Sequence, residues 1–151
     1  MIKFDTRIRV ERQIDEVFSY VSDVGNLPQW NSAVQSTRRT SRGDADGIGA
    51  TYSMLRTLPT GQARNDLEVV AHDRPSEFVI RTTSGPTPFV YRYRLSPHAD
   101  ATILHLEGEA ELGGTAGFLA PLVRRAVQSG VDRNLSTLKT ILETTRLDGS
   151  F

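Results

Sequence analysis

The spacing of hydrophobic and polar positions changes along the chain, and each change predicts a different element. Apolar and polar side chains alternate over residues 2–10, which predicts a strand with one buried face. A short amphipathic helix follows, because the next apolar positions have helical spacing: Ile14, Val17, Phe18 and Val21. Gly25 and Pro28 then leave room for at most one further helical turn before Trp30.

Alternation returns after residue 33, interrupted by clusters of Gly, Pro, Ser and Asp that are typical of turns. Six strands fit between these clusters, at about 33–40, 49–56, 63–72, 77–83, 89–95 and 101–110. Because the connections are short, the strands are predicted to form an antiparallel meander.

After Gly113 and Gly114 the spacing becomes helical again for about thirty residues. One broad apolar stripe runs along this helix: Leu119, Leu122, Val123, Ala126, Val127, Val131, Leu135, Leu138 and Leu142. A strongly twisted antiparallel sheet can curve around such a helix and bury its stripe. The chain is therefore predicted to be one α+β domain over residues 1–151, a seven-stranded curved antiparallel sheet around a long C-terminal helix, with two short helices after the first strand.

Composition and charge then remove several function classes. The 18 basic and 18 acidic residues cancel, so no nucleic-acid partner is expected. The absence of Cys excludes disulfides, thiolate catalysis and Cys-ligated metals. We find no secretory signal and no apolar run that could span a membrane, so the expected location is the cytoplasm, without stable membrane insertion.

The most conspicuous candidates for acid–base chemistry are His105, Glu107 and Glu109, which alternate along one predicted strand. Turning them inward would expose Leu104 and Leu106 to water. We therefore interpret the three residues as part of an outward charge ladder that pairs with arginines of the preceding strand.

The other histidines do not suggest a metal site. His72 shares its alternation face with Glu68 and Asp66, which we expect to point outward, and His98 lies in a turn. No pair of histidines has the spacing of metal ligands, so neither a metal nor another cofactor is expected.

A cavity is the remaining candidate site, because several positions predicted to face inward are small or polar: Asn65, Ala71, Thr82, Thr102, Gly108, Ala126 and Gly130. Glycine inside a helix costs about 1 kcal/mol relative to alanine. Gly130 therefore indicates close packing against the sheet, a bend, or space for a ligand.

Four segments carry a resemblance to a known family. The more specific ones are "IDEVFSYVSDVGNLPQWN" at 14–31 and "LAPLVRRAVQSGVDRNLSTLKTILE" at 119–143; "GIGATY" at 47–52 and "VVAHDRPSEFVIRT" at 69–82 are weaker. Nearly the whole chain resembles the polyketide cyclase/dehydrase branch of the START-like (SRPBCC) superfamily, which has the helix-grip fold. The resemblance implies a hydrophobic cavity between sheet and C-terminal helix. It does not imply one reaction, because members differ in activity and no catalytic set maps onto this sequence.

Binding of a small hydrophobic or aromatic ligand, lipid- or polyketide-like, is the first functional hypothesis. The candidate ligand-binding residues are Trp30, Tyr52, Met54, Asn65, Phe78, Ile80, Tyr91, Tyr93, Leu106, Phe118, Leu122 and Ala126. In this interpretation Leu27 and Trp30 fold back as apolar anchors, and Trp30 closes the rim of the cavity.

The alternative is a polyketide cyclase or dehydratase acting in the same cavity. Its candidate groups are the hydroxyls of Tyr91 and Tyr93 and, if it turns toward the cavity mouth, the guanidinium of Arg56. A third class, contact with a membrane or partner, rests only on Leu58 and Phe89, which we expect at exposed loops. A homodimer is compatible with the sequence.

Overall fold

The computed structural model describes residues 1–41, 47–58, 61–111 and 120–149. Strand β1 (Ile2–Val10) is followed by helix α1 (Ile14–Val21), the short 3₁₀ helix η1 (Val24–Asn26) and the four-residue helix α2 (Leu27–Trp30). Six strands come next: β2 (Val34–Arg39), β3 (Thr51–Leu58), β4 (Gly61–Asp73), β5 (Glu77–Ser84), β6 (Phe89–His98) and β7 (Ala101–Ala110). The long helix α3 (Ala120–Gly149) ends the described chain.

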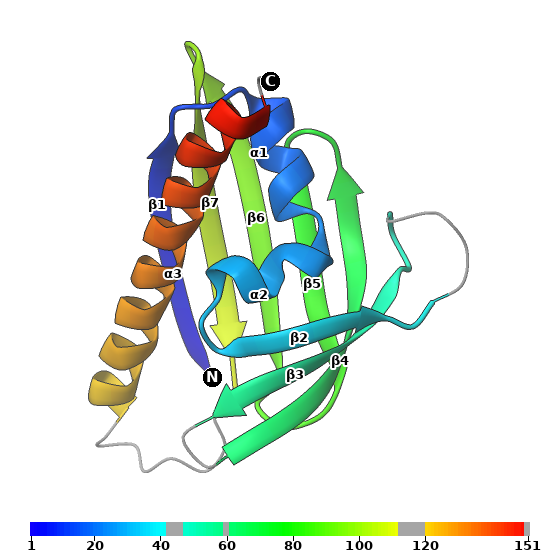
Figure 1. The fold of residues 1–151 in the computed structure, drawn as a ribbon. Coiled ribbons are helices and arrows are strands. Elements are labelled where there is room, and N and C mark those ends of the chain that lie inside the picture. The colour runs from blue at the N-terminus through cyan, green and yellow to red at the C-terminus, as the bar shows by residue number, and fades with distance from the viewer. Residues whose placement is uncertain (42–46, 59–60, 112–119, 150–151) are drawn as a thin grey trace.

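All seven strands form one antiparallel sheet in the order β1-β7-β6-β5-β4-β3-β2. Consecutive strands from β2 to β7 are neighbours, and β1 pairs with β7 at the far edge. The sheet curves, and α1, α2 and α3 all lie over its concave face (Figure 1). The predicted fold class, a curved antiparallel sheet around a C-terminal helix, is confirmed.

The outer face carries the charge ladder that the alternation predicted. Arg94 Nη1 lies 2.7 Å from Glu107 Oε1, and His105 Nε2 lies 3.0 Å from Asp5 Oδ2. Glu109 pairs with Lys3 of β1 at 3.6 Å instead of with an arginine of β6. These groups point away from the concave face, so they do not form an internal acid–base site.

The predicted orientation of His72 is wrong, because β4 contains a bulge. The register with β5 shifts between Val69 and Ala71, and this extra residue reverses the alternation beyond it. His72 therefore pairs with Phe78 and packs edge-on against Phe18 of α1, with ring centroids 5.2 Å apart. Ala71, expected to face inward, lies instead on the opposite face of the sheet, where it pairs with Val79.

Helix α3 is held mainly along β1. Gln128 Nε2 donates to the carbonyl of Asp5 at 3.0 Å, and Lys139 Nζ donates to the carbonyl of Arg9. Just after the last residue of β1, the Glu143 carboxylate accepts a 2.8 Å hydrogen bond from the amide of Glu11. These contacts fasten the helix to the edge of the sheet.

The apolar stripe of α3 is buried only in its second half. Val131, Leu135, Leu138 and Leu142 belong to the core. In the first half, Leu122 is 64% exposed and Ala126 is also exposed, so their predicted inward orientation is wrong. The helical spacing is regular, but in the first half only Val123 and Val127 pack against the core, and both are partly buried.

Two glycines that the sequence places inward have different surroundings. At Gly108 of β7, an added Cβ would overlap the Phe4 ring of β1, which lies across that position and contacts Tyr91 with ring centroids 5.6 Å apart. At Gly130 of α3, an added Cβ would meet only the Arg133 side chain, at 3.9 Å. Close packing therefore accounts for Gly108 and does not account for Gly130.

Substituting these glycines is expected to have opposite effects on stability. Gly108→Ala should lower the free energy of unfolding by about 1–3 kcal/mol, because the Phe4 ring must move. Gly130→Ala should raise it by up to about 1 kcal/mol, because alanine is the better helix former and meets no obstacle. Urea denaturation of both variants measures this, and equal effects of the same sign would contradict the packing described.

Candidate functional site

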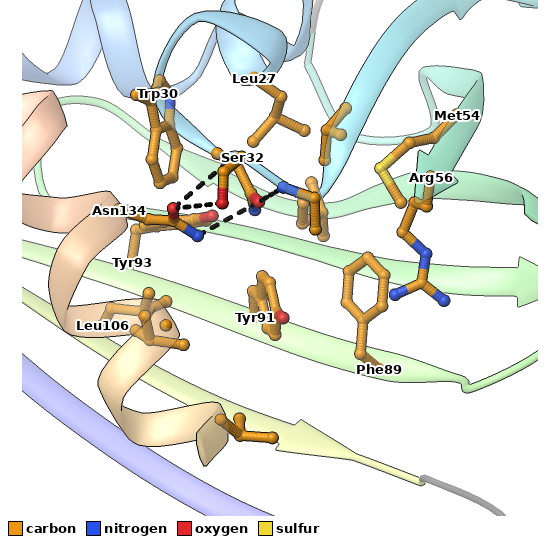
Figure 2. Close-up of a pocket in the computed structure, with 17 residues that line it drawn as sticks. Leu27, Trp30, Ser32, Met54, Arg56, Phe89, Tyr91, Tyr93, Leu106 and Asn134 are labelled. Atoms are coloured by element: carbon orange, nitrogen blue, oxygen red, sulfur yellow. Dashed lines mark hydrogen bonds between the residues drawn. The ribbon is translucent and has the colours of Figure 1, made fainter. Parts of the chain in front are cut away.

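A cavity of about 200 Å³ lies between the concave face of the sheet and α3, and it is bounded on another side by α2 and the turn into β2 (Figure 2). Every helix and strand of the fold except β1, β4, α1 and η1 contributes to its described lining. The lining residues are Leu27, Trp30, Asn31, Ser32, Ala33, Val34, Met54, Arg56, Ile80, Phe89, Tyr91, Tyr93, Leu106, Val127, Gly130, Val131 and Asn134. Its walls are therefore mostly apolar and aromatic, with a few polar groups, as in small-molecule sites.

Aromatic rings of β6 form one wall because alternate residues of a strand point to the same face. Phe89 and Tyr91 stack with ring centroids 4.4 Å apart, and Tyr93 meets Trp30 of α2 edge-on at 6.2 Å. Trp30 is only 3% exposed and Leu27 is also buried. Both residues fold back as apolar anchors at one end of the cavity, as the sequence predicted.

Arg56 of β3 turns toward the cavity at the opposite end from Trp30 (Figure 2). Its Nε donates to Asn65 Oδ1 at 2.9 Å, and its Nη2 donates to the carbonyls of Pro86 and Thr87 at 3.0 and 3.3 Å. Its Cζ lies 5.3 Å from the centre of the Phe89 ring, which is cation–π geometry. The guanidinium therefore has a fixed orientation, and Arg56 turns toward the cavity, which was the condition that the enzyme hypothesis set.

The charge of Arg56 has no carboxylate partner among the described residues. Burial lowers the pKa of Arg56, and the one opposing influence, which raises it, comes from Tyr91. Arginine still stays protonated in proteins. The cavity thus contains a half-buried cation whose hydrogen bonds go to neutral oxygens.

The hydroxyl groups of the site remain protonated. Burial raises the pKa of Tyr91, although Arg56 opposes the shift, and burial also raises the pKa of Tyr93, with a smaller contribution from Tyr91. Both phenols are consequently neutral hydrogen-bond donors. The Tyr93 hydroxyl and the Trp30 Nε1 are buried without a hydrogen-bond partner in the described structure.

Asn134 joins α3 to the turn after α2. Its Oδ1 accepts from the amide and the hydroxyl of Ser32 at 3.2 and 3.3 Å, and its Nδ2 donates to Asn31 Oδ1 at 3.2 Å (Figure 2). The same Asn31 oxygen accepts from the amide of Ala33 at 3.0 Å. This amide network holds the turn and the helix together at one wall of the cavity.

The structure brings together half of the predicted ligand-binding residues: Trp30, Met54, Ile80, Tyr91, Tyr93 and Leu106 line the cavity. Tyr52 and Phe78 are buried but lie outside the lining, and Asn65 stands behind Arg56 as its hydrogen-bond acceptor. Leu122 and Ala126 are exposed, as noted above. Phe118 lies outside the described residues.

Several lining residues were not among the candidate ligand-binding residues, although Gly130 was named as a position that could leave space for a ligand. Val127, Gly130, Val131 and Asn134 follow an i, i+3, i+4, i+7 pattern, so this helical face could have been found from the sequence. Phe89, which we expected at an exposed loop, is only 5% exposed and lines the cavity, and Leu58 is half-buried. The basis for a membrane-contacting loop is therefore lost.

The curved antiparallel sheet around the long C-terminal helix is a helix-grip fold. The family described as polyketide cyclase / dehydrase and lipid transport matches residues 1–143, and the chain belongs to that family. A comparison with curated proteins gives no match.

Solved structures with this fold include distant relatives. A protein from Thermus thermophilus superposes with a TM-score of 0.78 at 17% identity, covering 93% of this chain and 96% of its own. A START superfamily protein from Mycobacterium smegmatis gives 0.78 at 16% identity, with coverages of 95% and 98%. The Zhui aromatase/cyclase from Streptomyces sp. R1128 gives 0.73 at 12% identity, with coverages of 95% and 94%. At these identities the likeness shows the fold alone.

No helix within the described ranges is long and apolar enough to cross a membrane.

Replacing Trp30 tests whether it is part of the core. Trp30→Ala should lower the free energy of unfolding by about 3–5 kcal/mol, because it removes a large buried ring and leaves a void. Guanidinium denaturation followed by far-UV circular dichroism measures the loss without using Trp fluorescence, since Trp30 is the only tryptophan. Val90→Ala, at a partly exposed apolar position of β6, is the control and should change stability by much less. Unchanged stability with altered ligand binding would show that Trp30 is a gate.

Proposed function

We propose that this protein binds a small aromatic or otherwise apolar molecule that carries an acidic oxygen, with the acid group at Arg56 and the apolar body along the aromatic wall of β6. The observation that carries the proposal is the guanidinium of Arg56, which is half-buried at an apolar cavity and has no carboxylate partner among the described residues.

Electrostatics favours an anionic group on the ligand. Removing a charge from water is costly unless an opposite charge compensates it. The Arg56 hydrogen bonds to Asn65, Pro86 and Thr87 orient the guanidinium without neutralising it. No hydrogen bond uses Nη1 within the described residues, so this nitrogen can donate to a ligand oxygen.

The rest of the cavity favours an apolar body of modest size. Ile80, Leu106, Val127 and Val131 present aliphatic groups, and Phe89 and Tyr91 present ring faces. Sites for drug-sized ligands usually measure about 300–1,000 Å³. A cavity of about 200 Å³ is smaller and therefore suits a compact molecule.

The family supports this class of ligand. Its description includes polyketide cyclases, dehydrases and lipid transport, and one protein of similar fold is an aromatase/cyclase. Aromatic polyketides and lipid-like acids both combine an apolar body with acidic or enolic oxygens.

An enzyme of the cyclase or dehydratase type is the second candidate, and Arg56 is the observation that favours it. A guanidinium at an apolar cavity can stabilise the negative charge of an enolate. Proton abstraction also needs a base. No Asp, Glu or His belongs to the described lining, and the raised pKa values of Tyr91 and Tyr93 keep both phenols protonated. Ligand binding is therefore the better-supported function.

Isothermal titration calorimetry with 2-naphthoate and its uncharged analogue 2-naphthamide tests the role assigned to Arg56. Arg56→Gln should weaken 2-naphthoate binding by about tenfold or more, because it removes a charge-assisted hydrogen bond. The affinity for 2-naphthamide should change by less than about threefold, since a neutral bond of this kind contributes little.

Arg38→Gln is the matched control, because Arg38 is an exposed arginine of the neighbouring strand β2 and does not line the cavity. This variant should bind both compounds like the unmodified protein. If the unmodified protein binds neither compound, or if Arg56→Gln weakens both equally, the proposed anionic anchor is wrong.

A further inference from the structure

The hydroxyl of Tyr93 is a buried donor that the protein does not use. The side chain is 1% exposed, and its ring is packed between Trp30 and Phe78, with ring centroids 6.2 and 6.0 Å away. No hydrogen-bond partner for the oxygen exists in the described structure. Buried polar groups are nearly always paired, so an unpaired hydroxyl in a packed core requires an explanation.

The place of this hydroxyl suggests a ligand. Tyr93 lines the cavity, and Figure 2 shows its oxygen directed toward the space enclosed by the lining side chains. Among the lining residues, the other unpaired donor is the Trp30 indole nitrogen, which lies on the ring edge nearest the α2 ribbon in the same view. Of these two donors, Tyr93 is therefore the one whose oxygen is directed into the cavity.

We propose that Tyr93 forms a second, uncharged polar subsite at the far end of the cavity from Arg56, and that this subsite accepts a neutral carbonyl oxygen of the ligand, such as that of a ketone, quinone or lactone. The inference rests on the proposed function, because it assumes that the acidic end of the same ligand lies at Arg56.

The electrostatic environment at the Tyr93 end of the cavity favours a neutral group on the ligand. Burial and the neighbouring Tyr91 both raise the pKa of Tyr93, so the phenol donates its proton in a hydrogen bond and does not ionise. Arg56 is the only Lys or Arg in the described lining, and it lies at the opposite end. A carboxylate at Tyr93 would lose its hydration without gaining a cation, whereas a carbonyl oxygen needs only the one donor.

The spacing of the two subsites defines the shape of the ligand. Arg56 lies over Phe89, and Tyr93 is four residues further along β6. Four residues of a strand span roughly 13 Å, since each residue rises about 3.4 Å. A ligand that contacts both ends of this wall must therefore be elongated. A rigid two-ring acid with a carbonyl at its opposite end has this form.

Two probe ligands test the uncharged subsite at Tyr93 independently of the subsite at Arg56. 6-Acetyl-2-naphthoate has a carboxylate at one end and a ketone at the other, whereas 2-naphthoate lacks the ketone. By titration calorimetry the unmodified protein should bind 6-acetyl-2-naphthoate about fivefold more tightly, which corresponds to one neutral hydrogen bond. Tyr93→Phe should abolish this preference and leave the affinity for 2-naphthoate within about twofold.

Tyr20→Phe is the matched control, because it removes the phenol of a partly buried tyrosine of α1 that does not line the cavity. This variant should keep the preference for the ketone. A preference that survives Tyr93→Phe, or that Tyr20→Phe also removes, would overturn the assignment. Equal binding of the two probes to the unmodified protein would also overturn the assignment. If 2-naphthoate still binds in that case, the proposed function remains supported.

The unliganded protein provides an independent measurement. Because the Tyr93 hydroxyl has no partner in the empty cavity, Tyr93→Phe should leave the melting temperature unchanged or raise it. A marked decrease in melting temperature would show that the hydroxyl has a structural partner in solution, and it would contradict the subsite.

Discussion

The attachment of α3 along a single edge strand is the constraint on which the cavity depends. Side chains of α3 reach backbone groups of β1 or the turn after it at Asp5, Arg9 and Glu11. The second half of the helix also buries its apolar stripe in the core. Because the sheet curves away from β1 and the helix stays with that edge, the space opposite the middle of the helix is left for a cavity.

The polar groups around the cavity fall into two kinds. The side-chain amides of Asn65 and Asn134 form hydrogen bonds within the protein. Asn65 holds Arg56 in place, and Asn134 joins α3 to the turn after α2. The charge of Arg56 and the hydroxyl of Tyr93 are not compensated by described neighbours. Satisfied groups make the walls rigid, whereas unsatisfied groups reduce stability and are retained where a ligand completes them.

Alternation predicted most strands well, because burial of one sheet face imposes a period of two on the sequence. The outward ladder of His105, Glu107 and Glu109 and the inward ring positions of β6 follow directly from it. The prediction failed at His72, where a bulge added one residue to β4 and reversed the faces beyond it. A bulge changes the pairing with a neighbouring strand, and the pattern within β4 alone does not reveal it.

The sequence by itself determined the order of elements, the fold class, the buried position of Leu27 and Trp30 and the inward aromatic wall, because each depends on local spacing or on motifs within one segment. Only the tertiary structure decided which of these side chains share a cavity. Leu122 and Ala126 follow the apolar period of α3 but are exposed, since the position of the helix relative to the sheet is set by its contacts with β1. Arg56 faces inward because Asn65 of β4 and the loop between β5 and β6 accept its hydrogen bonds, and these partners lie in other segments of the chain.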